Sequence, residues 1–520
     1  MSCILYSLSY FMLRSHPSKE FLYKIPKGPT GFPVVGSFPF LTHYPELTLD
    51  KWAKRFGDLY SVWLGQQLVV VISSSDVAKD LLVTRGAICS SRKDMYIKSQ
   101  CVLAGRGITV TPYNDTWRKH RRIANDWLHQ KAVDKFTCVF DREATDMVNC
   151  LLEASSDGCS LVDPRPFAGR CSLNNMLTMV FGVRTGSVRD PLVSTALRLA
   201  REFMNVTGPL SNLLDFLPLL QHFPSKFRSR GQQLHRDLVK TYGGMIENIH
   251  QRLSCGQEVP DCLATTLLTM REEEELDDLD MAMMASAFMI GGVETTASIM
   301  QWFQALMPSY PEIQRRAQDE LDCVVGRDRL PDAQDEKNLP YCRAIIKEVE
   351  RCYNPFWLGT PHVVSEDFVY NGQLIPKDTV LVLNTWTIHH DERRFPEPQK
   401  FNPDHYINDT LSSAQSSNLS DANGRDHWMF GAGRRICPAI LVADREIFLA
   451  ISRILWSFTM EAAPGHPIDL KDYDGLSGRS PMPFKIRLRV RDNNVARVLK
   501  DATEGGLVSC LTTEVESLYA

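Results

Sequence analysis

The sequence contains no Cys-x-x-Cys pair, although it has 14 cysteines among its 520 residues. Zinc ribbons and dithiol redox sites use such pairs, so both classes are excluded, and scattered thiols are typical of a reduced protein that faces the cytosol. A Gly-x-Gly-x-x-Gly dinucleotide fingerprint is also missing. The sequence therefore does not indicate a dinucleotide site for hydride transfer on this chain.

Long apolar runs and an excess of one charge are missing as well. The 58 basic and 62 acidic residues give a net charge of −4, which does not point to nucleic acid as a partner. The apolar stretch Ile4–Leu13 is only about half of the ~20 residues that a membrane span requires. We expect residues 1–25 to be a short membrane-associating segment, with disorder as the alternative, and residues 26–36 to form a stiff Pro/Gly-rich linker.

What remains is ordinary globular composition, with 44% apolar and 23% charged residues. Apolar periodicity predicts helices over 76–85, 115–128, 131–154, 190–203, 226–253, 280–307, 312–325 and 340–353. Strand-like runs lie at 59–64, 68–73, 368–370, 379–383 and 484–490. We expect a mainly α-helical fold with small β-sheets, in which residues 37–491 form one catalytic domain, residues 408–426 a flexible surface insertion and residues 492–520 a C-terminal tail.

The most informative stretch runs from Phe430 to Ala439, with the sequence Phe-Gly-Ala-Gly-Arg-Arg-Ile-Cys-Pro-Ala. Its two glycines permit a tight, bulged backbone, and its proline suits the first position of the helix that follows. Cys437 is therefore expected at a helix N-terminus, where the backbone N–H groups favour a thiolate. With Arg435 nearby and Phe430 as an aromatic wedge, Cys437 is a candidate axial ligand for haem iron.

A second motif, Gly-Gly-Val-Glu-Thr-Thr over 291–296, interrupts an apolar stretch of the predicted helix 280–307. Paired glycines inside a helix cost about 1 kcal/mol each relative to alanine, so they need a reason, and the close approach of a flat cofactor is one. A carboxylate and a hydroxyl, Glu294 and Thr295, are costly in such a stretch unless they have partners. The motif thus indicates a functional site within the helix.

Together these motifs resemble those of the cytochrome P-450 superfamily, the haem-thiolate monooxygenases. Residues 430–439 are similar to its haem-binding signature Phe-x-x-Gly-x-Arg-x-Cys-x-Gly, with Ala439 in place of the last glycine. Residues 291–296 are similar to its oxygen-activation motif, and Glu348 and Arg351 to its Glu-x-x-Arg pair. The resemblance covers nearly the whole chain and implies the cytochrome P-450 fold, with haem between the long helix and the cysteine loop.

The resemblance also implies roles for single residues. Glu294 and Thr295 would be catalytic, handling protons and dioxygen, and the Cys437 thiolate would bind the iron of haem b. The brace of the haem-binding loop would be Glu348, Arg351 and His405, where His405 replaces the usual arginine. Haem would be held by Trp117, Arg121, His362, Phe430, Gly433, Arg435 and Cys437. The substrate pocket would be lined by Ile108, Phe288, Phe356, Trp357, Leu358 and Leu476.

The implied activity is insertion of one oxygen atom from O2 into a small lipophilic substrate, by hydroxylation, epoxidation or multistep oxidation, in the manner of a fungal microsomal enzyme of secondary metabolism. Electrons would come from NADPH–cytochrome P-450 reductase, with cytochrome b5 as a further donor. The expected place is the endoplasmic reticulum membrane, with the catalytic domain facing the cytosol and no nucleic acid as partner.

Three alternatives stay open at this point. One is a catabolic hydroxylase of a small aromatic compound. A second is a reductase-independent haem-thiolate isomerase or dehydratase, which is disfavoured because such an enzyme needs neither Glu294 nor Thr295 as a proton relay. The third is a haem-free binding protein that keeps the fold, and His405 and Ala439 are its only support.

Overall fold

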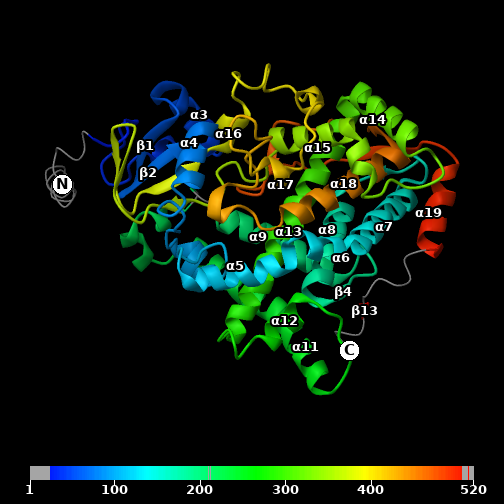
Figure 1. Cartoon of the computed structure of the whole chain (residues 1–520), viewed down its shortest axis with the longest axis horizontal. Coiled ribbons are helices and arrows are strands. Elements are labelled where there is room, and N and C mark those ends of the chain that lie inside the picture. The colour runs from blue at the N-terminus through cyan, green and yellow to red at the C-terminus, as the bar shows by residue number, and fades with distance from the viewer. Residues whose placement is uncertain (1–23, 209, 211, 506–512, 515–520) are drawn as a thin grey trace.

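The computed structural model describes residues 24–208, 210, 212–505 and 513–514. Most of the segment 1–25, for which membrane association is expected, lies outside this range, and so does the greater part of the C-terminal stretch from 506 onward. Figure 1 shows the described chain as a strand-rich end, near the N-terminus, that joins a larger helical body.

Helices make up most of the body, as the sequence predicts. The longer ones are α3 (Pro45–Phe56), α5 (Asp115–Leu128), α7 (Thr137–Ser155), α8 (Arg165–Phe181), α9 (Pro191–Val206), α10 (Lys226–Leu238), α11 (Gly244–Ser254), α13 (Asp278–Leu306), α14 (Pro311–Val324), α15 (Pro340–Cys352), α18 (Ile440–Ser457) and α19 (Asn494–Gly505). Shorter helices are α4 (Ser75–Ala78), α6 (Gln130–Lys135), α12 (Leu263–Thr269), α16 (Thr385–His389) and α17 (Ser413–Ser416).

The strands form small sheets. The largest has the order β1-β2-β8-β5, built from β1 (Leu59–Leu64), β2 (Gln67–Ile72), β8 (Val380–Leu383) and β5 (His362–Val363). A second has the order β3-β12-β9, from β3 (Leu161–Val162), β12 (Ile486–Val490) and β9 (Phe458–Ala462). Three strand pairs complete the set: β6 (Phe368–Tyr370) with β7 (Gln373–Ile375), β10 (Tyr473–Asp474) with β11 (Ser480–Pro481), and β4 (Val183–Arg184) with β13 (Thr513–Glu514).

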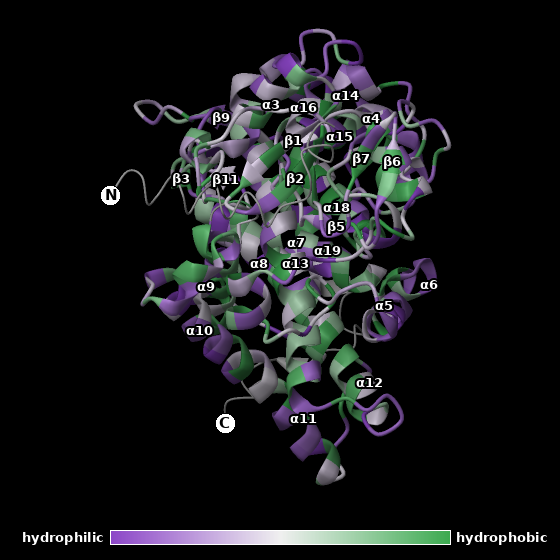
Figure 2. Cartoon of the chain, turned by 90° about the vertical axis from the view of Figure 1, so that its left-hand side faces the viewer, coloured by the Kyte–Doolittle hydropathy of each residue, from purple (hydrophilic) through white to green (hydrophobic). Residues whose placement is uncertain are grey.

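Helix α13 runs through the middle of the core and packs along α8. It begins at a capping box in which the Asp277 carboxylate accepts from the backbone N–H of Asp280, which satisfies a donor that the first turn would otherwise leave free. Helix α8 is not among the predicted helices, because nearly all of its side chains are buried and no apolar stripe marks one face. In Figure 2 the two helices lie together at the centre of the chain.

Three predicted helices are interrupted. The segment predicted over 76–85 begins as α4 and continues as a π-helical turn, Lys79–Thr84. The segment predicted over 131–154 divides at Phe136 into α6 and α7, and the segment predicted over 226–253 contains a π-helical turn, Val239–Gly243, between α10 and α11. Sequence periodicity follows the apolar face across such a break, because the side chains on both sides of it face the same core.

The Pro/Gly-rich segment 26–36 packs on the sheet rather than bridging freely to it. The Ser61 hydroxyl on β1 donates to the Pro26 carbonyl oxygen at 2.6 Å, and Gly36 pairs with Leu64. A Cβ atom at Gly28 would lie 1.6 Å from the Ser61 carbonyl oxygen, so only glycine fits there. This segment is part of the folded body, which corrects the expectation of a linker.

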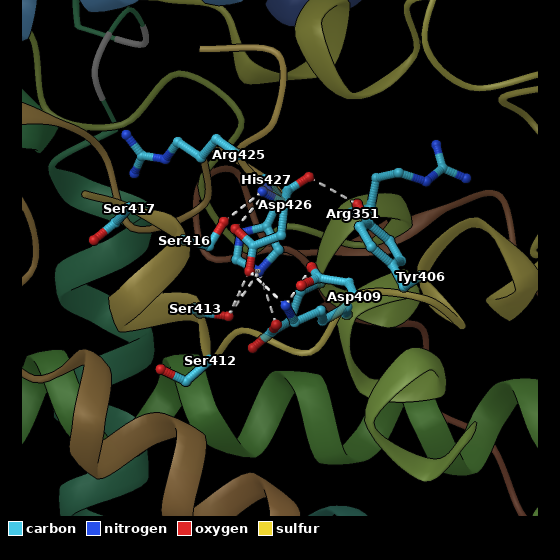
Figure 3. Close-up of polar contacts among 12 residues, drawn as sticks. Arg351, Tyr406, Asp409, Ser412, Ser413, Ser416, Ser417, Arg425, Asp426 and His427 are labelled. Atoms are coloured by element: carbon cyan, nitrogen blue, oxygen red, sulfur yellow. Dashed lines mark hydrogen bonds and ion pairs between the residues drawn. The ribbon is translucent and has the colours of Figure 1, made fainter. Parts of the chain in front are cut away.

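Residues 408–426 are anchored in the body, which corrects the prediction of a flexible surface insertion. Figure 3 shows Asp426 at the centre of their polar contacts: its carboxylate accepts from the Ser413 hydroxyl at 2.9 Å and lies 3.2 Å from the Lys347 ammonium. The Tyr406 hydroxyl donates to the Asp426 carbonyl oxygen at 2.9 Å, and the Ser416 hydroxyl accepts from its N–H at 2.7 Å. A composition rich in Ser, Asn and Asp is typical of a solvated loop. Composition alone cannot show that these polar groups form hydrogen bonds with one another.

The chain beyond Arg491 is not wholly a tail. Helix α19 lies against α7, and Val495, Val498 and Leu499 are buried there. The sequence gives three apolar residues at helical spacing, too few to distinguish a docked helix from a free one.

Candidate functional site

A large cavity lies between α13 and the loop that leads to α18. One wall consists of Phe430, Ala432 and Cys437 with the start of α18, and the facing wall consists of Gly291, Thr295 and Thr296 on α13. Helix α9 and the irregular segments around residues 98–109 and 354–362 complete the enclosure. The predicted cysteine loop and the predicted polar motif of the long helix therefore line one space.

The loop places the Cys437 sulfur in this cavity by close backbone packing. Gly433 has a φ of +63°, and a Cβ atom there would lie 1.9 Å from the Leu82 carbonyl oxygen, so glycine is required. The Cys437 N–H donates to the Phe430 carbonyl oxygen at 2.9 Å and closes the bulge. Ala439 caps α18 with a φ of −101°, a conformation that alanine adopts freely, so its replacement of the signature glycine causes no strain.

The environment of the Cys437 thiol is mixed. Burial raises its pKa, while the Ala439 N–H that points to the sulfur and the charge of Arg121 act in the opposite direction. Helix α18 begins three residues after Cys437, at Ile440, so the sulfur lies just ahead of the helix rather than in its first turn. A bound metal ion would shift the balance to the thiolate, because a coordinating thiol loses its proton.

Basic and hydrogen-bonding groups line the rim of the cavity. The Arg121 guanidinium donates to the Ile436 carbonyl oxygen at 2.7 Å, and the Arg435 guanidinium donates to the carbonyl oxygens of Ser90 and Thr111 at 2.9 and 2.7 Å. Arg435 also stacks 4.2 Å above the Trp117 ring. The His362 imidazole donates through Nδ1 to the Cys89 carbonyl oxygen at 2.7 Å, and burial holds its pKa well below the usual value. All four predicted rim residues thus come together.

Two further cations at the rim are absent from the sequence-based predictions. The Arg92 guanidinium donates to the carbonyl oxygens of Thr360 and Pro361 at 2.6 and 2.9 Å, while its buried Nε has no hydrogen-bond partner. Lys98 also lines the cavity. Arg92 lies in an irregular segment and Lys98 on the π-helical turn that follows it, and neither belongs to a motif, so only proximity in space reveals them.

On α13 the two glycines have different surroundings. A Cβ atom at Gly292 would come within 2.2 Å of the Met176 sulfur on α8, whereas nothing lies within 4 Å of such an atom at Gly291, which faces the cavity. One glycine therefore permits helix packing and the other leaves room for a flat group. The Thr295 hydroxyl donates to the Gly291 carbonyl oxygen at 2.6 Å within a continuous helix, so the described helix has no opening at this point.

Glu294 does not line the cavity. Its carboxylate forms an ion pair with Arg201 on α9 and accepts from the Ser480 hydroxyl on β11 at 3.1 Å. Burial raises its pKa, and the charge of Arg201 only partly offsets this. Adjacent residues on a helix point in different directions, which explains why Glu294 and Thr295 separate.

The predicted brace is assembled and buried. The Arg351 Nε and Nη2 atoms each donate to the Glu348 carboxylate at 2.7 Å, and the Asn402 N–H donates to it at 2.8 Å. His405 Nδ1 lies 3.1 Å from the same carboxylate. Arg351 also donates to the carbonyl oxygens of His389 and Pro398, so it ties α15 to the segment that precedes the cysteine loop. Burial alone would raise the pKa of Glu348, but these donors outweigh it and the pKa is lowered.

Four of the six residues expected in the substrate pocket line the cavity: Ile108, Phe288, Phe356 and Leu358. Trp357 and Leu476 do not, because they face a second cavity beside the segment 35–46. Trp357 is packed edge-on against Trp386, at 4.7 Å between ring centroids. The side chain next to it in sequence, Phe356, points to the first cavity, so apolar character alone could not separate the two.

The residues present fit haem b. Cys437 offers a soft sulfur donor on one wall, Gly291 leaves the opposite wall flat, and the orphaned Arg92 Nε with Arg121 and Arg435 can donate to carboxylates at the rim. A single sulfur ligand, a flat apolar space and a basic rim define a haem-thiolate protein of mainly helical fold.

Comparison with known proteins gives the family. A model of the cytochrome P-450 family matches residues 26–488. The chain is 34% identical over 491 residues to the cytochrome P-450 monooxygenase virE of Hypocrea virens, covering 92% of this chain and 88% of the relative. It is 32% identical over 492 residues to the cytochrome P-450 monooxygenase polD of Polytolypa hystricis, covering 91% and 92%. The chain therefore belongs to the cytochrome P-450 family.

Family membership confirms several predictions. The fold is that of a cytochrome P-450, the protein is an oxidoreductase of the monooxygenase type, and its cofactor is haem b with a cysteine thiolate ligand. Its partners include O2, a substrate and a redox partner. Within the described residues one helical stretch, Asp278–Ser309, has the length and composition of a membrane span. Of its most apolar 18 residues, 72% are buried inside the protein, as in a core helix.

Proposed function

We propose that this protein inserts one oxygen atom of O2 into a small lipophilic substrate in fungal secondary metabolism, using electrons that a separate NADPH–cytochrome P-450 reductase delivers. The observation that carries this proposal is that Cys437, Thr295 and the basic rim share one otherwise apolar cavity. Cytochrome b5 is a second donor in this proposal. When bound, the haem supplies the oxygen chemistry, because its thiolate ligand donates electron density that favours O–O cleavage.

In this proposal Cys437 is the axial ligand, and the rim groups Trp117, Arg121, His362 and Arg435 hold the two haem carboxylates, joined by Arg92. The rim supplies charge-assisted donors, which buried carboxylates need. Glu348, Arg351 and His405 keep the cysteine loop in place through the segment before it. Phe430 and Gly433 shape the loop itself.

Thr295 is the residue that we assign to proton delivery inside the cavity. Its hydroxyl can donate to an oxygen in the cavity once it leaves the Gly291 carbonyl, and it can accept a proton in exchange. Glu294 supplies that proton only after its carboxylate leaves Arg201 and turns toward the cavity. The raised pKa of Glu294 suits this role, since a carboxyl whose pKa lies closer to the working pH carries a proton more of the time and can both release and regain it.

The chain's N-terminal side supports association with the endoplasmic reticulum membrane. Large apolar side chains are exposed there on two segments: Phe32, Val34 and Phe40 on one, and Leu213, Leu219, Leu220 and Phe223 on the other. Both segments contribute to the second cavity, through Val35, Phe38 and Leu213. Exposed apolar patches of this kind mark membrane or partner contacts. We propose that this side rests on the membrane while the catalytic domain faces the cytosol.

The first test is the spectrum of the reduced, carbon monoxide-bound protein. We expect the red-shifted Soret band of thiolate-ligated haem in the wild type and its loss in Cys437→Ser. Cys323→Ser, which removes an exposed thiol remote from the cavity, is the matched control and should keep the band. A Cys437→Ser variant with an unchanged band would place the ligand elsewhere.

The second test is turnover. Extracts of cells that express the protein together with a reductase should contain an oxygenated product by mass spectrometry, and its formation should stop without NADPH. Product formation that continues without NADPH would instead identify the reductase-independent isomerase or dehydratase.

A further inference from the structure

Lys98 is a charged group inside the cavity with no role in the proposed function. It lies on the π-helical segment Tyr96–Val102, and its neighbours in the cavity wall are Phe203 on α9 and Thr360 ahead of β5. Its ammonium nitrogen donates to the Thr360 hydroxyl at 3.3 Å and lies 5.7 Å from the centre of the Phe203 ring. These neighbours place it beside α9 and close to Arg92, which donates to the Thr360 carbonyl oxygen.

The ammonium group is poorly satisfied. It has three N–H donors, and within the described part of the chain one of them meets a neutral hydroxyl while no carboxylate forms an ion pair with it. The nearest acid, Asp215, accepts from the Ile97 N–H at 2.9 Å instead. Burial and the charge of Arg92 lower the pKa of Lys98 to about 7, and Asp215 only partly offsets this. A cation in such a place gains from an anion that enters the cavity.

The haem carboxylates can be bound without Lys98. The cations that line the cavity are Arg92, Lys98, Arg121 and Arg435, whereas haem b brings two carboxylates. Each of the three arginines donates to a backbone carbonyl oxygen at the rim, and these hydrogen bonds position them to bind the two haem carboxylates. Lys98 is therefore the cation that stays available after the cofactor is bound.

We propose that Lys98 binds the carboxylate of a lipophilic carboxylic acid, so that the substrate of this enzyme is an acid with an apolar body. The inference rests on the proposed function, since it names the substrate class of the same cavity. The apolar body would lie against Phe203, Phe288 and Ile299, and the oxidised carbon would be remote from the carboxylate, because Lys98 and Cys437 belong to different walls. The Thr360 hydroxyl would position the ammonium group for this ion pair.

The test uses a matched pair of haem-binding probes with the purified holoprotein. One is an imidazole that carries a straight alkyl chain ending in a carboxylate, and the other has the same chain ending in a methyl ester. The imidazole nitrogen ligates the iron and shifts the Soret band, so both affinities are read from spectra without turnover. We expect the wild type to bind the acid about tenfold more tightly than the ester, as a charge-assisted hydrogen bond in a desolvated site would give.

Lys98→Met should abolish this preference and leave the affinity for the ester within about twofold, because it removes charge and keeps an unbranched apolar chain. Lys98→Arg should retain most of the preference. Lys93→Met is the control: it removes an ammonium just ahead of that segment, which donates to Gln67 and does not line the cavity, and it should behave as the wild type.

Three results would overturn the inference. One is a wild type that binds both probes equally, and another is a Lys98→Met protein that keeps the preference for the acid. The third is a Lys98→Met protein that loses haem more readily than the wild type, since Lys98 would then bind the cofactor. Failure of the proposed function looks different: the protein would show no thiolate Soret band and no spectral shift with either probe.

Discussion

Two buried carboxylates of this protein, those of Glu348 and Glu294, differ sharply in their surroundings. Glu348 on α15 accepts from both nitrogens of the Arg351 fork, from a backbone N–H and from His405, and its pKa is lowered. Glu294 on α13 has one arginine and one hydroxyl, and its pKa is raised. Burial is nearly the same, at 0% and 5% exposure. The number of hydrogen-bond donors therefore decides whether the pKa of the buried carboxyl is lowered or raised.

The difference separates a structural site from a site that can change. A carboxylate with four donors, all from elements near the cysteine loop, is fixed in its charged form and in its position. A buried carboxylate with two donors is less stabilised in its charged form, and it can exchange those donors for other partners. The first arrangement suits a brace that must not move, and the second suits a group that passes protons.

The largest effect should come from Glu348→Gln. The change leaves the Arg351 cation buried without its charge partner, so we expect a loss of about 3–5 kcal/mol in the free energy of unfolding, together with weaker haem retention. Urea unfolding and the transfer of haem to apomyoglobin would measure both. The control, Glu312→Gln, removes an exposed acid of a surface pair and should change neither. A loss no greater than that of the control would contradict the idea of a brace.

Glu294→Gln should affect turnover more than stability. Glutamine still offers Arg201 an acceptor but cannot carry a proton, so we expect product formation to fall by roughly 10²-fold while NADPH use falls less. The ratio of product to NADPH consumed, measured in H2O and D2O, distinguishes a proton defect from a folding defect. An unchanged ratio would remove Glu294 from the proton path.

The pH dependence of the brace follows from the lowered pKa of Glu348. Because the unfolded chain takes up this proton first, the stabilisation is present above the ordinary glutamate value of 4.5 and is lost as the pH falls through the lower folded value. The stability gap between wild type and Glu348→Gln should therefore stay constant from pH 7 down to about pH 5 and narrow as the pH falls below 4.5, so the comparison is made at pH 7 and at about pH 3. Urea titrations followed by circular dichroism at both pH values would show it, and a gap that widens in acid would reverse the assigned sign.

His405→Ala should have the smallest effect, about 1 kcal/mol. Glu348 keeps the Arg351 fork and the Asn402 N–H and loses one hydrogen bond, and the long 3.3 Å hydrogen bond from His405 Nε2 to the Pro396 carbonyl oxygen is lost with it. The same urea titration applies. A cost as large as that of Glu348→Gln would mean that the histidine, rather than the arginine, holds the carboxylate.

Much of this comparison could be predicted from local sequence. Helix α5 has its predicted bounds, Asp115–Leu128, because an Asn114 cap and an apolar face mark it clearly. The Glu-x-x-Arg spacing likewise puts Glu348 and Arg351 on one helix face, where they meet. In both cases the partners are within a few residues of each other along the chain.

What could not be predicted depends on partners from distant segments. Arg201 and Ser480, which hold Glu294, come from α9 and β11, and nothing in the sequence links them to α13. Lys98 is an isolated lysine in a segment without a motif, and its place in the cavity depends on Thr360 and Phe203. Helix periodicity cannot show which neighbour a side chain meets in a fold of this size.

Gly433 allows two distant regions of the chain, the cysteine loop and the segment around Leu82, to pack directly against each other. Since the Leu82 carbonyl occupies the space that a Cβ atom at position 433 would need, the depth at which the sulfur sits is set by a segment some 350 positions earlier, which also lines the cavity. Neither stretch can drift in evolution without a compensating change in the other. Swapping the cysteine loop alone between relatives should therefore disturb the pocket as well as the iron site.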